Sequence, residues 1–126
     1  MHPVNNEQYE EELLALNSKI DKQELDLWTI QRKLEAIGAE MKREESLHLK
    51  TIAEDMVEVS GKQVKTYKNE LERNVELERR LDNSKSYLEM KVNTETLKEQ
   101  LRDGIIALGS SKRVFKIHEI ISRRGD

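Results

Sequence analysis

Hydrophobic residues recur at alternating three- and four-residue steps through the first third of the chain. The eight positions are Leu13, Leu16, Ile20, Leu27, Ile30, Leu34, Ile37 and Met41, with Gln23 in the one polar slot of the series. A seven-residue repeat of this kind is typical of a coiled-coil helix, in which a narrow apolar line faces a partner helix. The pattern therefore predicts a long helix that uses these eight residues as an oligomer seam.

Capping signals place the start of this helix close to residue 6. Asn5 and Asn6 are good N-cap residues, and the acidic residues that follow suit the positive end of a helix. The apolar pattern slips by one residue between residues 42 and 48. Because no Gly or Pro lies there, an unbroken helix with a register shift is favoured over a break.

Ser60 and Gly61 mark the next candidate break, because Gly just past a helix end can adopt the left-handed conformation that closes it. Two architectures remain open. A helical hairpin that turns at Gly61 would lay Leu34 near Leu88 and Met41 near Leu81, whereas a continuous rod would tolerate the glycine at a cost of about 1 kcal/mol. A second turn at residues 82–84 would give a three-helix bundle instead.

The pattern of residues 112–124 predicts a short amphipathic helix. Gly109, Ser110 and Ser111 precede it and predict a helix stop and a flexible joint. One face of this helix is apolar, with Val114, Ile117 and Ile121 beside Phe115 and Ile120. The same segment carries five possible anion contacts, Lys112, Arg113, Lys116, Arg123 and Arg124. Such a helix can dock on its own bundle, a protein groove, an anionic membrane or nucleic acid.

The only tryptophan, Trp28, falls on an outward position beside the seam, one turn from Leu25. Tryptophan is enriched among the residues that dominate interface energy. We therefore expect Leu25 and Trp28, together with Val114, Phe115, Ile117 and Ile121, to make partner contacts.

Composition favours an oligomer over a thick single core. Charged residues make up 37% of the chain and aromatic residues only 4%, against about 25% charged in an ordinary domain. Leucine dominates one seam position and isoleucine the other, which favours a tetramer if the helices are parallel. The halves carry net charges of −7 and +4, which favours an antiparallel contact. We expect self-association as a dimer or tetramer.

The sequence contains no signature of catalysis or of cofactor binding. Cysteine is absent, the five glycines are isolated, and no serine lies in a nucleophile-elbow pattern. Glu45 and His48 have the spacing of a di-iron motif, but no second pair accompanies them. We expect no metal and no enzymatic activity. With no signal peptide or spanning apolar stretch, the expected location is cytoplasmic.

The predicted fold class is all-α, with long coiled-coil helices, as a helical hairpin or continuous rod, and a short C-terminal helix in an oligomeric bundle. The predicted segments are residues 1–5 (N-terminal extension), 6–60 (first coiled-coil arm), 61–108 (second helical arm) and 109–126 (basic amphipathic segment). The expected function is that of a scaffold or adaptor, which self-assembles and presents its C-terminal segment to another protein. Nucleic-acid binding through that segment is the alternative.

Overall fold

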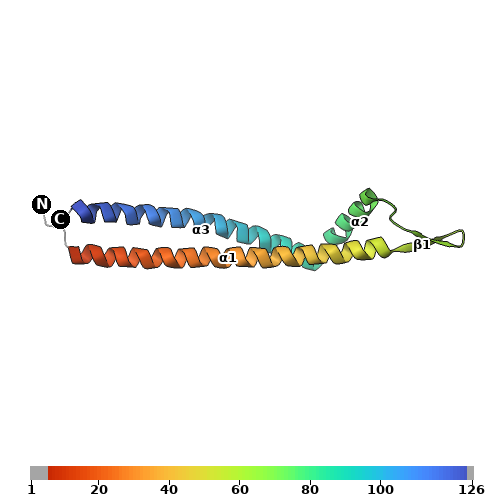
Figure 1. The fold of residues 1–126 in the computed structure, drawn as a ribbon, viewed down its shortest axis with the longest axis horizontal. Helices are drawn as coiled ribbons and strands as arrows, with labels where there is room; N and C mark the ends of the chain where they lie inside the picture. Colours follow the sequence, from red (N-terminus) through yellow and green to blue (C-terminus); the bar gives the residue numbers. More distant parts are fainter. Residues whose placement is uncertain (1–5, 125–126) are drawn as a thin grey trace. The chain divides into compact units, whose positions relative to one another are not determined.

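The computed structural model of the chain describes residues 6–124 and is mostly helical (Figure 1). Its elements, in chain order, are α1 (Asn6–Glu54), β1 (Met56–Val59), β2 (Lys62–Lys65), α2 (Glu70–Asp82) and α3 (Lys85–Arg124). The prediction of a helical fold is confirmed at this level. The small sheet was not predicted, and the predicted extension of residues 1–5 lies outside the described residues. In residues 6–124, no helix is apolar enough over a sufficient length to cross a membrane.

The described residues fall into two compact units, each of which holds part of α1 and part of α3. Unit 1 contains residues 6–33 and 97–124, and unit 2 contains residues 34–96. Within unit 1, Lys112 reaches Glu24 and His118 reaches Glu12, so the two helical segments run antiparallel. The segments in unit 2 are also antiparallel, because Met41 contacts Thr94 and Glu45 contacts Tyr87.

α1 is unbroken from Asn6 to Glu54, as the absence of Gly and Pro from residues 42–48 predicted. Its seam residues are half-buried, and Ile20 is buried. The helix also buries Ile52, near its C-terminal end, more completely than any other described large side chain, with none of its surface exposed. The apolar face of α1 therefore continues past the register shift.

The break at Gly61 is a turn, but it joins two β-strands and not two helices. Ser60 and Gly61 both have positive φ, 53° and 81°. Positive φ at both central residues is typical of a two-residue type I′ turn, whose twist matches that of an antiparallel hairpin. β1 and β2 pair with Met56 opposite Lys65 and Val59 opposite Lys62.

The predicted register of the helical hairpin was wrong. Met41 lies near Thr94, whose Oγ1 donates to the Met41 sulfur at 3.7 Å, and not near Leu81. The two helices of the hairpin are separated in sequence by the strands and by α2, whereas the prediction assumed a tight turn at Gly61. Because of these intervening residues, the α3 residue that faces Met41 lies about a dozen positions later in the chain than predicted.

The turn at residues 82–84, which the sequence left as an alternative to one helical arm over residues 61–108, is present, because α2 ends at Asp82 and α3 begins at Lys85. Asn83 closes α2, and its backbone N–H donates to the last carbonyls of the helix. At the other end, the Asn69 side chain accepts from the backbone N–H of Glu72 at 2.8 Å, which is a standard N-cap. α2 is therefore a separate, capped helix.

The predicted helix stop at residues 109–111 was wrong, because α3 continues through it to Arg124. Helical glycine and serine cost at most about 1 kcal/mol each, which tertiary packing can offset. Ser111 is buried, with 6% of its surface exposed, and faces the interior. Small residues also allow close approach at Gly104, where an added Cβ would lie 2.6 Å from Leu27 Cδ2. The C-terminal segment is therefore the end of α3 and not a separate short helix.

Candidate functional site

The eight predicted seam residues lie on one side of α1, where the chain already supplies a partner helix. Leu27 approaches Gly104 in unit 1, and Met41 accepts a hydrogen bond from Thr94 in unit 2. The inward line of α3 keeps the same seven-residue spacing. Its half-buried or buried members in unit 1 are Leu97, Leu101, Gly104, Leu108, Ser111, Phe115, His118 and Ser122. The α1 seam thus packs, at least in part, within the chain.

The β1–β2 hairpin has one apolar face, formed by Val57, Val59 and Val64. Cross-strand partners share a face, so the pairing of Val57 with Val64 places both valines beside Val59 and the aliphatic stem of Lys62. Val57 and Val59 are 44% and 53% exposed, and Val64 is half-buried. Within the described residues, the sheet has these two strands alone. The apolar face of the hairpin is therefore largely open to solvent.

Both edges of the hairpin carry backbone groups that point away from the partner strand. The Thr66 N–H donates to the Asp55 carbonyl at 3.0 Å, which identifies these two residues as a hydrogen-bonded pair. Because hydrogen-bonded and non-hydrogen-bonded pairs alternate in an antiparallel ladder, the pairs Met56–Lys65 and Glu58–Gln63 are non-hydrogen-bonded. Their N–H and C=O groups point outward and are available to another strand.

α3 has a second apolar line on its outer side, which we call the outer stripe. Its members are Ile106, Val114, Ile117, Ile120 and Ile121, which are between 37% and 64% exposed. Three of the predicted partner contacts, Val114, Ile117 and Ile121, belong to it. Phe115 does not, because it is half-buried on the inward line and borders a hollow of about 410 Å³ with Leu13 and Leu14.

The predicted contacts Leu25 and Trp28 are both exposed on α1, at 60% and 53%. The Arg32 guanidinium lies 4.7 Å from the centre of the Trp28 ring, a cation–π contact. This contact occupies part of one ring face and leaves more than half of the side chain in solvent.

Two of the five basic residues predicted as anion contacts have acidic partners within the chain. Lys112 Nζ lies 3.4 Å from Glu24 Oε1, and Arg123 Nη2 lies 2.8 Å from Glu119 Oε1. Arg113, Lys116 and Arg124 are exposed. Two of the five charges are therefore already paired with acids within the chain.

Polar contacts hold α1 against the start of α3 in unit 2. The Tyr87 hydroxyl donates to Glu45 Oε1 at 2.6 Å, and Ser84 and Ser86 both donate to Glu44. The hydrogen bond to Glu45, followed by burial, raises the pKa of Tyr87 to about 12. Glu45 thus serves an inter-helix contact. Among residues 6–124, no group of three or more His, Cys, Asp and Glu side chains could hold a metal ion.

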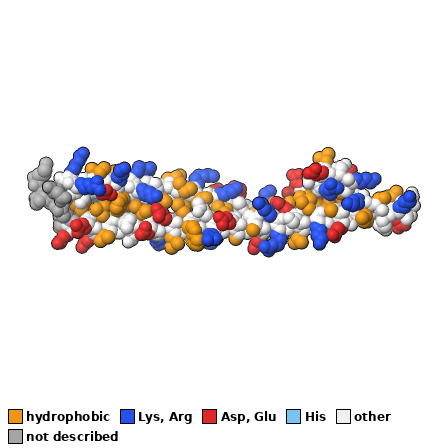
Figure 2. All heavy atoms as spheres, in the orientation of Figure 1, with side chains coloured by type: hydrophobic (Ala, Val, Ile, Leu, Met, Phe, Trp, Pro, Cys, Tyr) orange, Lys and Arg blue, Asp and Glu red, His pale blue; other side chains and the backbone are white. Residues whose placement is uncertain are grey.

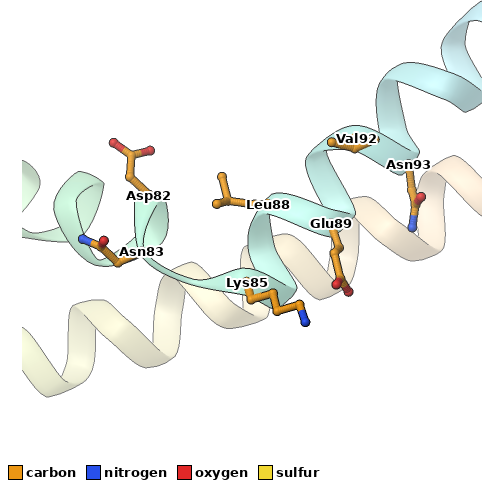
Figure 3. Close-up of a pocket in the computed structure, with 7 residues that line it drawn as sticks. All are labelled: Asp82, Asn83, Lys85, Leu88, Glu89, Val92 and Asn93. Carbon is orange, nitrogen blue, oxygen red and sulfur yellow. The ribbon is translucent and has the colours of Figure 1, made fainter.

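An open hollow of about 750 Å³ borders the junction of α2 and α3 (Figure 3). Figure 3 shows Leu88 pointing from α3 toward the end of α2, near Asp82, while Glu89 points away. The charges of the lining residues Asp82, Lys85 and Glu89 are mixed in sign. The hollow has no converging polar groups that would select a small ligand.

Glu76, on α2, is 8% exposed and lies between two arginines. Arg79 Nη2 donates to Glu76 Oε1 at 2.6 Å and Arg80 Nε donates to the same oxygen at 2.9 Å. These hydrogen bonds, first from Arg79 and then from Arg80, lower the pKa of Glu76 from 4.5 to about 2. Because the folded-state pKa is depressed, the carboxylate stabilises the fold above pH 4.5, and this contribution is lost as the pH falls toward 2.

We expect Glu76→Gln to remove this part of the pH dependence. Urea unfolding followed at several pH values should show the wild type losing stability between pH 4.5 and pH 2 more steeply than the variant. Glu78→Gln, an equal charge change at an exposed α2 position, is the control. Equal pH profiles for wild type and Glu76→Gln would show that the ion pairs do not stabilise the folded state.

Comparison with protein-family models, with curated proteins and with solved structures finds no match. The feature that sequence reasoning missed is the β-hairpin. Its signal is present as alternating valines on both sides of a two-residue Ser-Gly turn, at Val57, Val59 and Val64. The helical pattern on either side outweighed this short signal.

Proposed function

We propose that this chain is a non-catalytic helical interaction protein, which associates with copies of itself through the β1–β2 hairpin and uses α3 to contact another protein. The observation that carries the proposal is the exposed apolar face of the hairpin, with both strand edges unpaired within the described residues. An isolated two-stranded hairpin is marginally stable in water, whereas three or more strands with a shared hydrophobic face are stable. Added strands from other copies would supply this stability.

Charge favours pairing of β1 of one copy with β2 of the next. β1 carries Glu58, whereas β2 carries Lys62 and Lys65. Two β1 strands side by side would bring like charges together, which destabilises a sheet, whereas β1 beside β2 pairs opposite charges. Contacts of this head-to-tail kind close into rings when the rotation allows, which fits a tetramer better than a dimer, because a two-fold dimer uses the same surface on both copies. Coiled-coil packing between copies, through helix faces left open within the units, would add to this.

The polar residues of the described chain support a non-catalytic role. Glu76, Glu45 and Glu44 hydrogen bond to neighbouring side chains, so their carboxylates serve contacts within the fold. Protein binding is favoured over nucleic-acid binding because Lys112 and Arg123 already face acidic partners. A nucleic acid would have to compete with both ion pairs for the basic segment.

Size-exclusion chromatography with multi-angle light scattering tests the self-association. The full chain, of 14.8 kDa, should have a multimeric mass that falls on dilution. Val57→Lys places a charge on the apolar face of the hairpin and should shift the mass toward the monomer. Val75→Lys, at an α2 position of 61% exposure, should leave the mass unchanged. A wild type that is monomeric at all concentrations, with normal helical circular dichroism, would overturn hairpin-mediated assembly.

A further inference from the structure

Over residues 104–122, α3 carries five large apolar residues on its outer side and two, Leu108 and Phe115, on its inward line. The inward line contains Gly104, Ser111, His118 and Ser122, which are small or polar. The outer stripe defined above consists entirely of β-branched residues, of which Ile106 and Ile117 are 64% and 57% exposed. Figure 2 shows hydrophobic side chains at the surface, interspersed with Lys and Arg. An apolar line of this kind, interrupted at Ser110, on a helix that already has a partner indicates a second binding surface.

The geometry of the outer stripe suits a helix. Ile106, Val114, Ile117 and Ile121, with Ser110 between the first two, follow steps of four and three residues. These are the steps by which one helix packs along another. From Ile106 to Ile121 the stripe is roughly 22 Å long at 1.5 Å per residue, which is about four helical turns. It is a line on a convex surface, which a helix can follow and a small molecule cannot fill.

Charge indicates what kind of helix fits. Residues 102–124 carry six Lys and Arg against two Asp and Glu. Arg113 is four residues before Ile117, and Arg124 is three residues after Ile121, so both lie on the side of α3 that carries the stripe. A partner with apolar residues at helical spacing and acidic residues on its flanks would cover the stripe and meet both arginines.

The same observations disfavour two other occupants. A second copy packed stripe to stripe would bring the arginines of both copies together, which costs energy unless each finds an acid. An anionic membrane on the outer stripe would lie about one helix diameter from the α1 part of unit 1, where residues 7–26 contain seven Asp and Glu against two Lys. These acids would be repelled by the lipid headgroups.

We propose that the outer stripe of α3 is the docking surface for an amphipathic helix of another protein, with an apolar face and acidic flanks. This docking deepens the proposed function, since it defines the partner contact of α3, and it does not require the hairpin to mediate assembly.

Fluorescence anisotropy with the full chain tests this docking. The probe is a labelled synthetic helical peptide of about four turns, with Leu at alternating three- and four-residue steps and Glu on both flanks. A matched peptide carries Lys in place of each Glu. We expect the Glu peptide to bind about tenfold or more tightly than the Lys peptide, because only the former complements Arg113 and Arg124.

Substitutions on α3 locate the site. Ile117→Ser with Ile121→Ser should weaken binding of the Glu peptide about tenfold or more, since it removes apolar contact area at the centre of the stripe. Ile105→Ser, at a 54% exposed position on the other side of α3, is the matched control and should bind as the wild type does. Arg113→Glu with Arg124→Glu should reverse the preference between the two peptides.

Three results would overturn this docking: no binding of the Glu peptide, equal binding of both peptides, or equal losses in the stripe variant and in Ile105→Ser. Sedimentation of the chain with phosphatidylserine vesicles, in the absence of peptide binding, would assign the stripe to a membrane. The mass of the stripe variant by light scattering separates the two proposals. A wild-type mass with lost peptide binding supports the docking whether or not the hairpin assembles the chain.

Discussion

Ile52→Ala is expected to lower the free energy of unfolding by about 2–5 kcal/mol, the largest effect of any single truncation in the described chain. Ile52 has no exposed surface, whereas the other buried apolar side chains, such as Ile20 and Leu81, keep 8%. Truncation removes the transfer free energy of the lost methyl and methylene groups. It also leaves a cavity beside α1 that the surrounding helices can close only in part.

Urea unfolding monitored by circular dichroism measures this loss, with all proteins at one concentration because assembly contributes to apparent stability. Val75→Ala is the matched control. It also shortens a β-branched helical side chain, but Val75 is 61% exposed, so the change should stay within about 0.5 kcal/mol. A loss of similar size in both variants would mean that residue 52 is not the centre of a packed core.

Gly61→Val is expected to disrupt the β-hairpin. Gly61 has φ of 81°. For a residue with a Cβ, this left-handed conformation raises the conformational free energy by about 1–2 kcal/mol, and β-branching raises it further. The hairpin contains only four residues per strand, so this cost is large compared with its own stability. Hydrogen exchange should show lost protection at Val57 and Val64, which the ladder pairs, while the helices stay protected.

The same variant should also lose self-association in light scattering if the hairpin assembles the chain. Gly38→Ala is the control, because an added Cβ there has no atom within 4 Å and should stabilise α1 by about 0.5–1 kcal/mol without changing the mass. Retained exchange protection in Gly61→Val would contradict the type I′ turn. Lost protection with an unchanged mass would keep the turn and exclude the hairpin as the assembly element.

The predicted site residues differ in how well sequence pattern placed them. The seven-residue repeat placed the residues from Leu13 to Met41 on one side of α1, where they are half-buried or buried, and their role as an oligomer seam stays a prediction. The outer stripe was found in part, through Val114, Ile117 and Ile121. Phe115 was placed beside this face as a partner contact but lies on the inward line, because five apolar residues within eight positions do not by themselves identify which side meets α1.

Local patterns alone determined that the chain is helical and that α1 is continuous from residue 6 past residue 48. Each depends on propensity, capping or periodicity within a few turns. Tertiary structure alone decided the rest. Ser111 and Gly104 stay helical because they fit against α1, and Met41 meets Thr94 because a hairpin and α2 lie between the two long helices. Such outcomes depend on contacts between residues far apart in sequence, and a pattern within a few helical turns carries no information about the energies of those contacts.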